Sequence, residues 1–130
     1  MPKIISILML LALSSDVIAE WVKVADVMLG KGTSYVDKTT IRRSGDTATM
    51  WSLTDIVTPE AIDGRPYLSQ KSRYEYDCKD NHVRSTATSR YTGNMGSGNL
   101  VASDDQVGQW MAAAPYSLLD YMLKVACGKQ

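Results

Sequence analysis

The sequence predicts an α+β fold, in which an antiparallel sheet of about six strands carries a C-terminal α-helix packed on one face. Three observations support this prediction. Short runs rich in Val, Thr, Tyr and Trp alternate with Gly, Asp, Asn and Pro between Glu20 and Ala102, as in strands joined by turns. From Pro115 onward the apolar period changes to three and four residues, which is typical of a helix. The only two cysteines, Cys78 and Cys127, lie in these two regions, so a disulfide would tie the helix to the sheet.

The first residues have the pattern of a secretory signal peptide. A positive charge at Lys3 is followed by an apolar run over residues 4–13, a polar break and a small-residue ending at Ala19. The apolar run is shorter than the roughly 20 residues that a membrane-spanning helix needs. We therefore expect residues 1–19 to be cleaved, and residues 20–130 to form a single domain that is periplasmic or secreted and has no transmembrane segment. Export also favours the disulfide, because oxidising compartments preserve such bonds.

The charge composition gives no sign of a polyanionic partner. The chain holds 14 Lys and Arg residues and 14 Asp and Glu residues, so its formal net charge is zero. Proteins that bind nucleic acids are usually basic, because they neutralise phosphates. We therefore expect no nucleic-acid partner.

Six strands are expected before the helix, separated by residues that start turns or tolerate positive φ, such as Ser44-Gly45-Asp46 and Asp63-Gly64-Arg65-Pro66. The stretch 58–66 is interpreted as a long loop, and the glycine-rich stretch 93–98 as a mobile hairpin tip. An exposed edge strand of such a sheet would also allow a homodimer to form by sheet extension. The strands are predicted near residues 21–27, 34–37, 48–57, 68–78, 83–92 and 100–103.

The C-terminal segment has the pattern of one amphipathic helix of about three turns. Pro115 suits a first helical position, and Ser117 with Asp120 three residues later resembles a capping box. Gly128 suits the position just after a helix end. The residues expected on the apolar face are Tyr116, Leu119, Met122, Leu123, Ala126 and Cys127.

Alternation along the strands predicts the side of the sheet on which the helix lies. In segment 74–78 the two tyrosines share a face with Cys78, so a bridge to Cys127 requires the helix to lie on that face. The next strand would present its small side chains to the helix and its longer polar ones to solvent. The two sets are Val83, Ser85, Ala87 and Ser89, and Arg84, Thr86, Thr88 and Arg90.

Short motifs recur in a recognisable order along residues 20–128. The most specific are Tyr-Glu-Tyr-Asp-Cys at 74–78 together with Val-Ala-Cys at 125–127. The others are Trp21, Tyr35-Val36-Asp37, Ile41-Arg42-Arg43, Trp51-Ser52-Leu53, Ser69-Gln70-Lys71-Ser72, Trp110 and Pro115-Tyr116-Ser117. In this order the chain resembles the surface-adhesin protein E family.

The resemblance implies an antiparallel sheet with a C-terminal helix tied to it by the same disulfide. The family is named for a bacterial surface lipoprotein that binds host extracellular-matrix proteins, so it also implies an exported binding module with a host protein as partner. The chain departs from that pattern at the expected cut, where Glu20 follows Ala19 and the lipid-bearing cysteine of a lipoprotein is absent. Surface display and adhesion therefore need an argument from a site, because fold alone does not give function.

No residue pattern predicts an enzyme, a metal or a cofactor. His82 is the only histidine and stands beside a turn, without the G-x-S-x-G context of a serine hydrolase. One histidine and two bridged cysteines leave no set of transition-metal ligands. Asp104-Asp105 lacks the spacing of a calcium loop and is interpreted as a charged loop. The stretch 93–98 lacks the Lys and Ser or Thr of a phosphate-binding loop.

A basic and aromatic patch on the outer sheet face is the candidate binding site. Acidic host proteins or glycans would need such a surface, although alternating charges on a solvated sheet face also occur for solubility alone. Arg84 of this patch is expected near Glu75 or Asp77. The three tryptophans, Trp21, Trp51 and Trp110, are assigned to the core and to helix docking. The candidate patch consists of Lys71, Arg73, Arg84, Arg90, Tyr67 and Tyr91.

The sequence thus favours a non-enzymatic exported binding or interaction module. One alternative is an adhesin that binds host matrix proteins such as vitronectin or laminin at the cell surface. Another is a periplasmic structural or assembly protein with a bacterial partner. A hydrolase built around His82 is the third.

Overall fold

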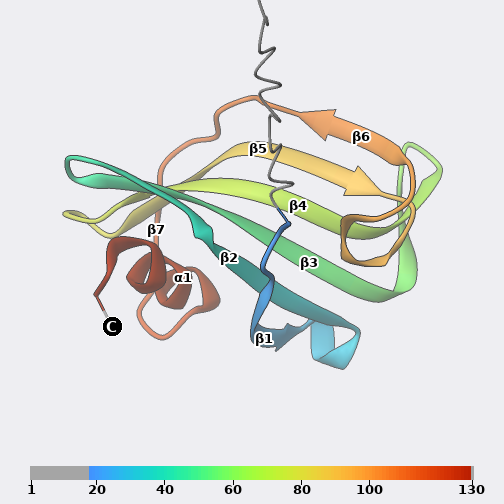
Figure 1. Ribbon diagram of the computed structural model, residues 1–130, viewed down its shortest axis with the longest axis horizontal. Helices are drawn as coiled ribbons and strands as arrows, with labels where there is room; N and C mark the ends of the chain where they lie inside the picture. The colour runs from blue at the N-terminus through green and yellow to red at the C-terminus, as the bar shows by residue number, and fades with distance from the viewer. Residues whose placement is uncertain (1–17, 130) are drawn as a thin grey trace, which may run out of the picture.

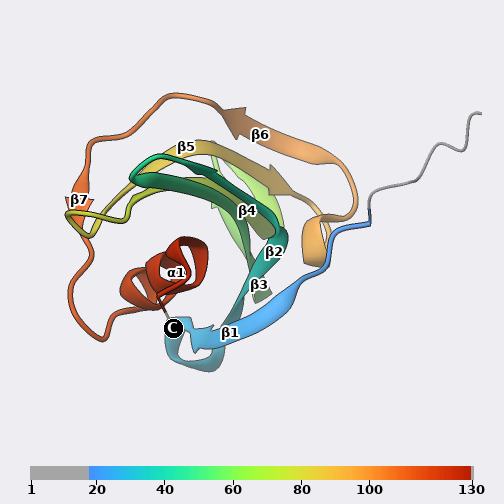
Figure 2. The ribbon, with the colours of Figure 1, turned by 60° about the vertical axis from the view of Figure 1, so that its left-hand side comes forward.

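A computed structural model describes residues 18–129 of the chain, and the expected signal peptide falls outside the described residues except for Ile18 and Ala19. One curled sheet wraps around one helix (Figures 1 and 2). The sheet is an antiparallel meander in the order β1-β2-β3-β4-β5-β6, and a short seventh strand, β7, pairs with β5. The predicted antiparallel sheet with a C-terminal helix is confirmed.

The elements follow one another with few interruptions. The strands are β1 (Val22–Val27), β2 (Gly32–Ser44), β3 (Thr47–Ile62), β4 (Arg65–Asp77), β5 (His82–Tyr91), β6 (Leu100–Asp104) and β7 (Met111–Ala112). Single turns of 3-10 helix occur at η1 (Met28–Gly30) and η2 (Asn94–Gly96), and the helix is α1 (Leu118–Cys127).

The stretch 58–66 is part of a hairpin, so its interpretation as a long loop is wrong. β3 continues to Ile62 and β4 begins at Arg65, and the two residues between them have the positive φ of a tight hairpin turn. Pro59 lies in an irregular part of β3, where the pairing register shifts between Asp55 and Glu60. A proline is tolerated at such a bulge because the ladder there needs no N–H donor.

A β-bulge in β5 changes which side chains share a face. Arg73 pairs with Ala87 but Tyr74 pairs with Ser85, so Thr86 is an extra residue in β5. Side chains before the bulge follow the predicted alternation, whereas those after it are shifted by one position. The prediction that Arg84 and Arg90 share a face is therefore wrong. Ala87 and Ser89 likewise do not share the face of Val83 and Ser85.

Helix α1 begins later than predicted but ends as expected. Ser117 is the N-cap and accepts a hydrogen bond from Asp120 N at 3.2 Å, while the Asp120 carboxylate accepts one from Tyr116 N at 3.1 Å. Pro115 precedes this cap, and Tyr116, with φ 64° and 99% exposure, is not on the apolar face. Gly128 ends the helix at φ 68°, where Gly128 N and Lys129 N donate to the last carbonyls.

The core lies between α1 and the concave face of the sheet. Met122 and Leu123 of the helix pack among Val36, Met50 and Tyr76 of the strands, all less than 3% exposed. The Cys78–Cys127 disulfide closes this layer with a Cα–Cα distance of 5.7 Å, which confirms the predicted bridge and the predicted side for the helix. Arg43 adds a hydrogen bond of 2.9 Å to the Cys127 carbonyl.

The Asp120 carboxylate makes the stability of the helix start dependent on pH. A hydrogen bond from Lys124 and a second from Tyr116 N hold the pKa of Asp120 below its ordinary value. A carboxylate with a depressed pKa in the folded state stabilises that state above the unfolded pKa of about 4, and the contribution is lost as the pH falls through the folded value. We expect Asp120→Asn to lower the melting temperature at pH 7 and to have almost no effect near pH 2, as measured by calorimetry. An equal fall in melting temperature at both pH values would contradict this account.

Candidate binding surface

The face of the sheet opposite α1 is called the outer face here, and it carries most of the predicted patch. Residues directly opposite each other on neighbouring strands share a face. Trp51 lies opposite Arg73, which itself lies opposite Ala87, and Lys71 lies opposite Ser89. Tyr91 follows Ser89 by two positions and lies on the same face. Arg84 also belongs to the outer face, because it pairs with Glu75 before the bulge.

The other two members of the predicted patch lie elsewhere. Arg90 pairs with Gln70, which lies on the concave side of the sheet. The Arg90 guanidinium carbon lies 5.5 Å from the centre of the Tyr67 ring, and Tyr67 lines a hollow with Gln70 and Ile56. The bulge at Thr86 accounts for Arg90, whereas Tyr67 lies next to a separate register shift between β3 and β4. The structure therefore brings Lys71, Arg73, Arg84 and Tyr91 together and separates Arg90 and Tyr67 from them.

The three tryptophans are surface residues, so their assignment to the core and to helix docking is wrong. Trp51 is half-buried on the outer face, and the Arg73 guanidinium carbon lies 5.8 Å from the centre of its ring. Trp110 is 39% exposed, and the Arg84 guanidinium carbon lies 4.2 Å from its ring. Trp21 is half-buried beside a groove of the outer face. The core instead takes its large side chains from the concave face of the sheet, such as Met50 of β3 and Tyr76 of β4.

A groove of about 340 Å³ runs along the outer face and brings aromatic and polar residues together. A second hollow of about 230 Å³ adjoins it, sharing Thr40 and Trp51 and adding Arg42, Thr49 and Arg73. We call the first hollow the tryptophan groove. Its lining residues are Ala19, Trp21, Asp37, Thr40, Trp51, Lys71, Ser89 and Tyr91.

An irregularity in β2 shapes one side of the tryptophan groove. The regular pairing of β2 with β3 stops at Asp37 and resumes at Arg42. Thr40 occupies the gap, where its hydroxyl donates to the Asp37 carbonyl at 2.6 Å and accepts from Trp51 N at 2.9 Å. Residue alternation does not show that Thr40 and Asp37 line a site, because the position of a register shift is not visible in it. A polar Asp-Lys-Thr-Thr run in a strand was the one available signal.

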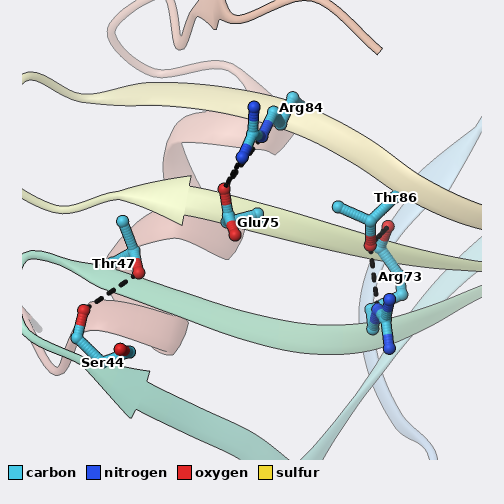
Figure 3. Close-up of polar contacts among 6 residues, drawn as sticks. All are labelled: Ser44, Thr47, Arg73, Glu75, Arg84 and Thr86. Atoms are coloured by element: carbon cyan, nitrogen blue, oxygen red, sulfur yellow. Dashed lines mark hydrogen bonds and ion pairs between the residues drawn. The ribbon is translucent and has the colours of Figure 1, made fainter. Parts of the chain in front are cut away.

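The positively charged side chains of the outer face differ in the groups that they contact. Arg84 donates through Nε to Glu75 Oε1 at 2.8 Å, as the sequence predicted for this pair (Figure 3). Arg73 donates instead to the hydroxyl of Thr86 at 2.8 Å (Figure 3). Lys71 Nζ lies 5.1 Å from the centre of the Tyr91 ring. Within residues 18–129 no carboxylate forms an ion pair with Lys71 or Arg73, so both are free to meet an anionic group.

The 92–99 segment folds back over the outer face rather than projecting as a hairpin tip. The Asp55 carboxylate accepts hydrogen bonds from Asn94 Nδ2 at 3.1 Å and Met95 N at 2.8 Å, and Ser69 Oγ accepts one from Gly96 N at 2.9 Å. A Cβ on Gly96 would lie 2.4 Å from Lys71 Cε. Glycine at this position therefore lets the Lys71 side chain pass beneath the segment and reach the groove.

The part of the chain that the structure describes contains no group of three or more His, Cys, Asp and Glu residues that could hold a metal ion. None of the helices in residues 18–129 is long and apolar enough to cross a membrane. His82 pairs with Asp77 at the start of β5 and with Ala112 of β7, away from the tryptophan groove.

Comparison with known proteins identifies the family. The sequence model of the family described as surface-adhesin protein E matches residues 21–128 of this chain. The chain belongs to the surface-adhesin protein E family. Membership indicates an exported, adhesin-like surface protein. No curated protein matches the chain.

Solved structures of Haemophilus influenzae protein E share the fold. One aligns with a TM-score of 0.66 and 14% identity, covering 87% of each chain. The selenomethionine form aligns with a TM-score of 0.65 and 15% identity, covering 88% of this chain and 90% of the other. Protein E from a non-typeable strain aligns with a TM-score of 0.63 and 15% identity, over 88% of this chain and 79% of that one. At this identity the likeness concerns the fold.

Proposed function

We propose that the chain is a non-enzymatic adhesin that acts outside the cell and binds a host extracellular-matrix protein through the tryptophan groove. The observation that supports this most strongly is the arrangement of free cations beside half-buried aromatic rings on one face. Lys71 lies beside Tyr91, and Arg73 lies beside Trp51. Neither cation has a carboxylate partner within the described residues.

The chemistry of the groove suits an acidic segment of a folded protein. Aromatic residues and arginine are enriched at the centres of protein interfaces, where they fill well-packed and desolvated pockets. A cation that lies against a ring keeps its charge while its apolar stem is covered. An acidic partner would therefore find charge complementarity from Lys71 and Arg73, and apolar contact from Trp51 and Tyr91. Host matrix proteins, the partners that the resemblance implies, are the first to test, with vitronectin and laminin as representatives.

Location on the cell separates this proposal from a periplasmic assembly role. We expect intact cells that express the native chain to attach to surfaces coated with vitronectin or laminin. Mild protease treatment of the intact cells should remove both the protein and the attachment. A control strain that expresses a periplasmic marker enzyme should keep that enzyme during the same treatment.

Two outcomes would contradict the proposal. If the chain is released only by osmotic shock and survives protease treatment of intact cells, the periplasmic role is the better account. If the chain is exposed but attachment to both matrix proteins equals that of cells lacking it, adhesion to these partners is excluded.

A further inference from the structure

A buried carboxylate faces the nitrogen of residue 20. Asp37 is only 2% exposed, and one of its oxygens, Oδ1, accepts hydrogen bonds from the backbone N–H and the hydroxyl of Thr39. The other oxygen, Oδ2, accepts one from Glu20 N at 3.1 Å. Within residues 18–129 no Lys or Arg forms an ion pair with this carboxylate. A buried carboxylate without a counter-charge is costly, so a cation is expected at this position.

Signal-peptide cleavage would supply that cation. Hydrolysis of the Ala19–Glu20 peptide bond by a signal peptidase consumes one water, leaves a carboxylate on Ala19 and leaves an amine on Glu20. An α-amine has an ordinary pKa of about 8, so it is protonated at neutral pH. We propose that the α-ammonium group created at Glu20 binds the buried Asp37 carboxylate, and that Asp37 is thereby the receptor site for the processed amino terminus.

The position of this ion pair links processing to the tryptophan groove. Asp37 and Trp21 both line the groove, and Val22, the first residue of β1, pairs with Val36. An ammonium group held at Asp37 therefore fixes the start of β1 and the side of the groove that Trp21 forms. Cleavage also removes Ala19, which lines the same groove in the uncleaved chain.

A double-mutant cycle tests the ion pair. Four proteins are compared: chains beginning at Glu20 and chains that keep Ile18-Ala19 in front of it, each with Asp37 or with Asp37→Asn. We expect the extension to lower the melting temperature by roughly 5 °C or more with Asp37 present, and by less than about 1 °C with Asp37→Asn. Asp26→Asn serves as the matched control, because Asp26 is an exposed carboxylate of β1 and should leave the effect of the extension unchanged. An equal effect of the extension with Asp37 and with Asp37→Asn would overturn the proposal.

Chemical labelling gives a second readout that needs no variant. An acylating reagent that reacts with unprotonated amines is applied at pH 7 to the folded chain beginning at Glu20, and then to the same chain unfolded in urea. We expect the α-amine to react at least tenfold more slowly in the folded chain, because the Asp37 carboxylate keeps it protonated and covered. Equal rates would overturn the proposal.

Mass spectrometry of the exported protein is expected to give a first residue of Glu20, and a different first residue would also overturn the proposal.

Discussion

Reducing the Cys78–Cys127 disulfide is expected to lower the free energy of unfolding by about 4 kcal/mol, which corresponds to a fall in melting temperature of roughly 15 °C. The bridge spans a sequence separation of 49 residues, and a loop of this length loses much conformational freedom in the unfolded chain when it is closed. The bridge also joins α1 to the end of β4, so without it the helix is held mainly by the packing of side chains such as Met122 and Leu123.

Calorimetry with and without a thiol reductant measures this effect. The double variant Cys78→Ala with Cys127→Ala should match the reduced protein and should not respond to the reductant. A melting temperature that the reductant leaves unchanged would contradict the prediction. So would the finding of two free thiols in the unfolded, non-reduced protein.

The sheet, the helix and the bridge could be predicted from the sequence because each depends on a local pattern. Period-two alternation in segment 74–78 put Cys78 on the face that α1 covers, and the three-and-four spacing before Gly128 indicated the helix. Turn chemistry also predicted the hairpin at Gly45, where β2 meets β3. It also indicated the turn at 63–64, but the residues on either side of that turn were assigned to a long loop, whereas β3 and β4 extend through them across the bulge near Pro59.

The composition of the candidate site could be predicted only in part. Alternation assigned Lys71 and Arg73 correctly to the outer face, but one extra residue at Thr86 reversed the alternation and moved Arg90 to the other side. A bulge depends on pairing with a strand that is distant in the sequence, so no local pattern reveals it. Trp51 was misassigned for a different reason. Its size suggested burial, whereas its pairing with Arg73 places it on the outer face.

The division of the predicted patch provides two matched pairs of residues for testing the tryptophan groove. Lys71 beside Tyr91 and Arg90 beside Tyr67 are both a cation next to a tyrosine ring, and they lie on opposite faces of the sheet. Replacing either pair removes one positive charge and one aromatic ring. A difference between the two double variants therefore reports the face and not the loss of charge.

The affinity of the purified chain for immobilised vitronectin and laminin, measured with these two double variants, tests the central claim most directly. We expect Lys71→Gln with Tyr91→Ala to weaken binding at least thirtyfold, because residues at the centre of an interface contribute about 2 kcal/mol or more. Arg90→Gln with Tyr67→Ala should change the affinity by less than about threefold, within the roughly 0.5 kcal/mol typical of a substitution outside an interface. Circular dichroism and melting temperature confirm that both variants are folded. Equal losses in the two variants, or an undiminished affinity in the Lys71 and Tyr91 variant, would contradict the assignment of binding to the tryptophan groove.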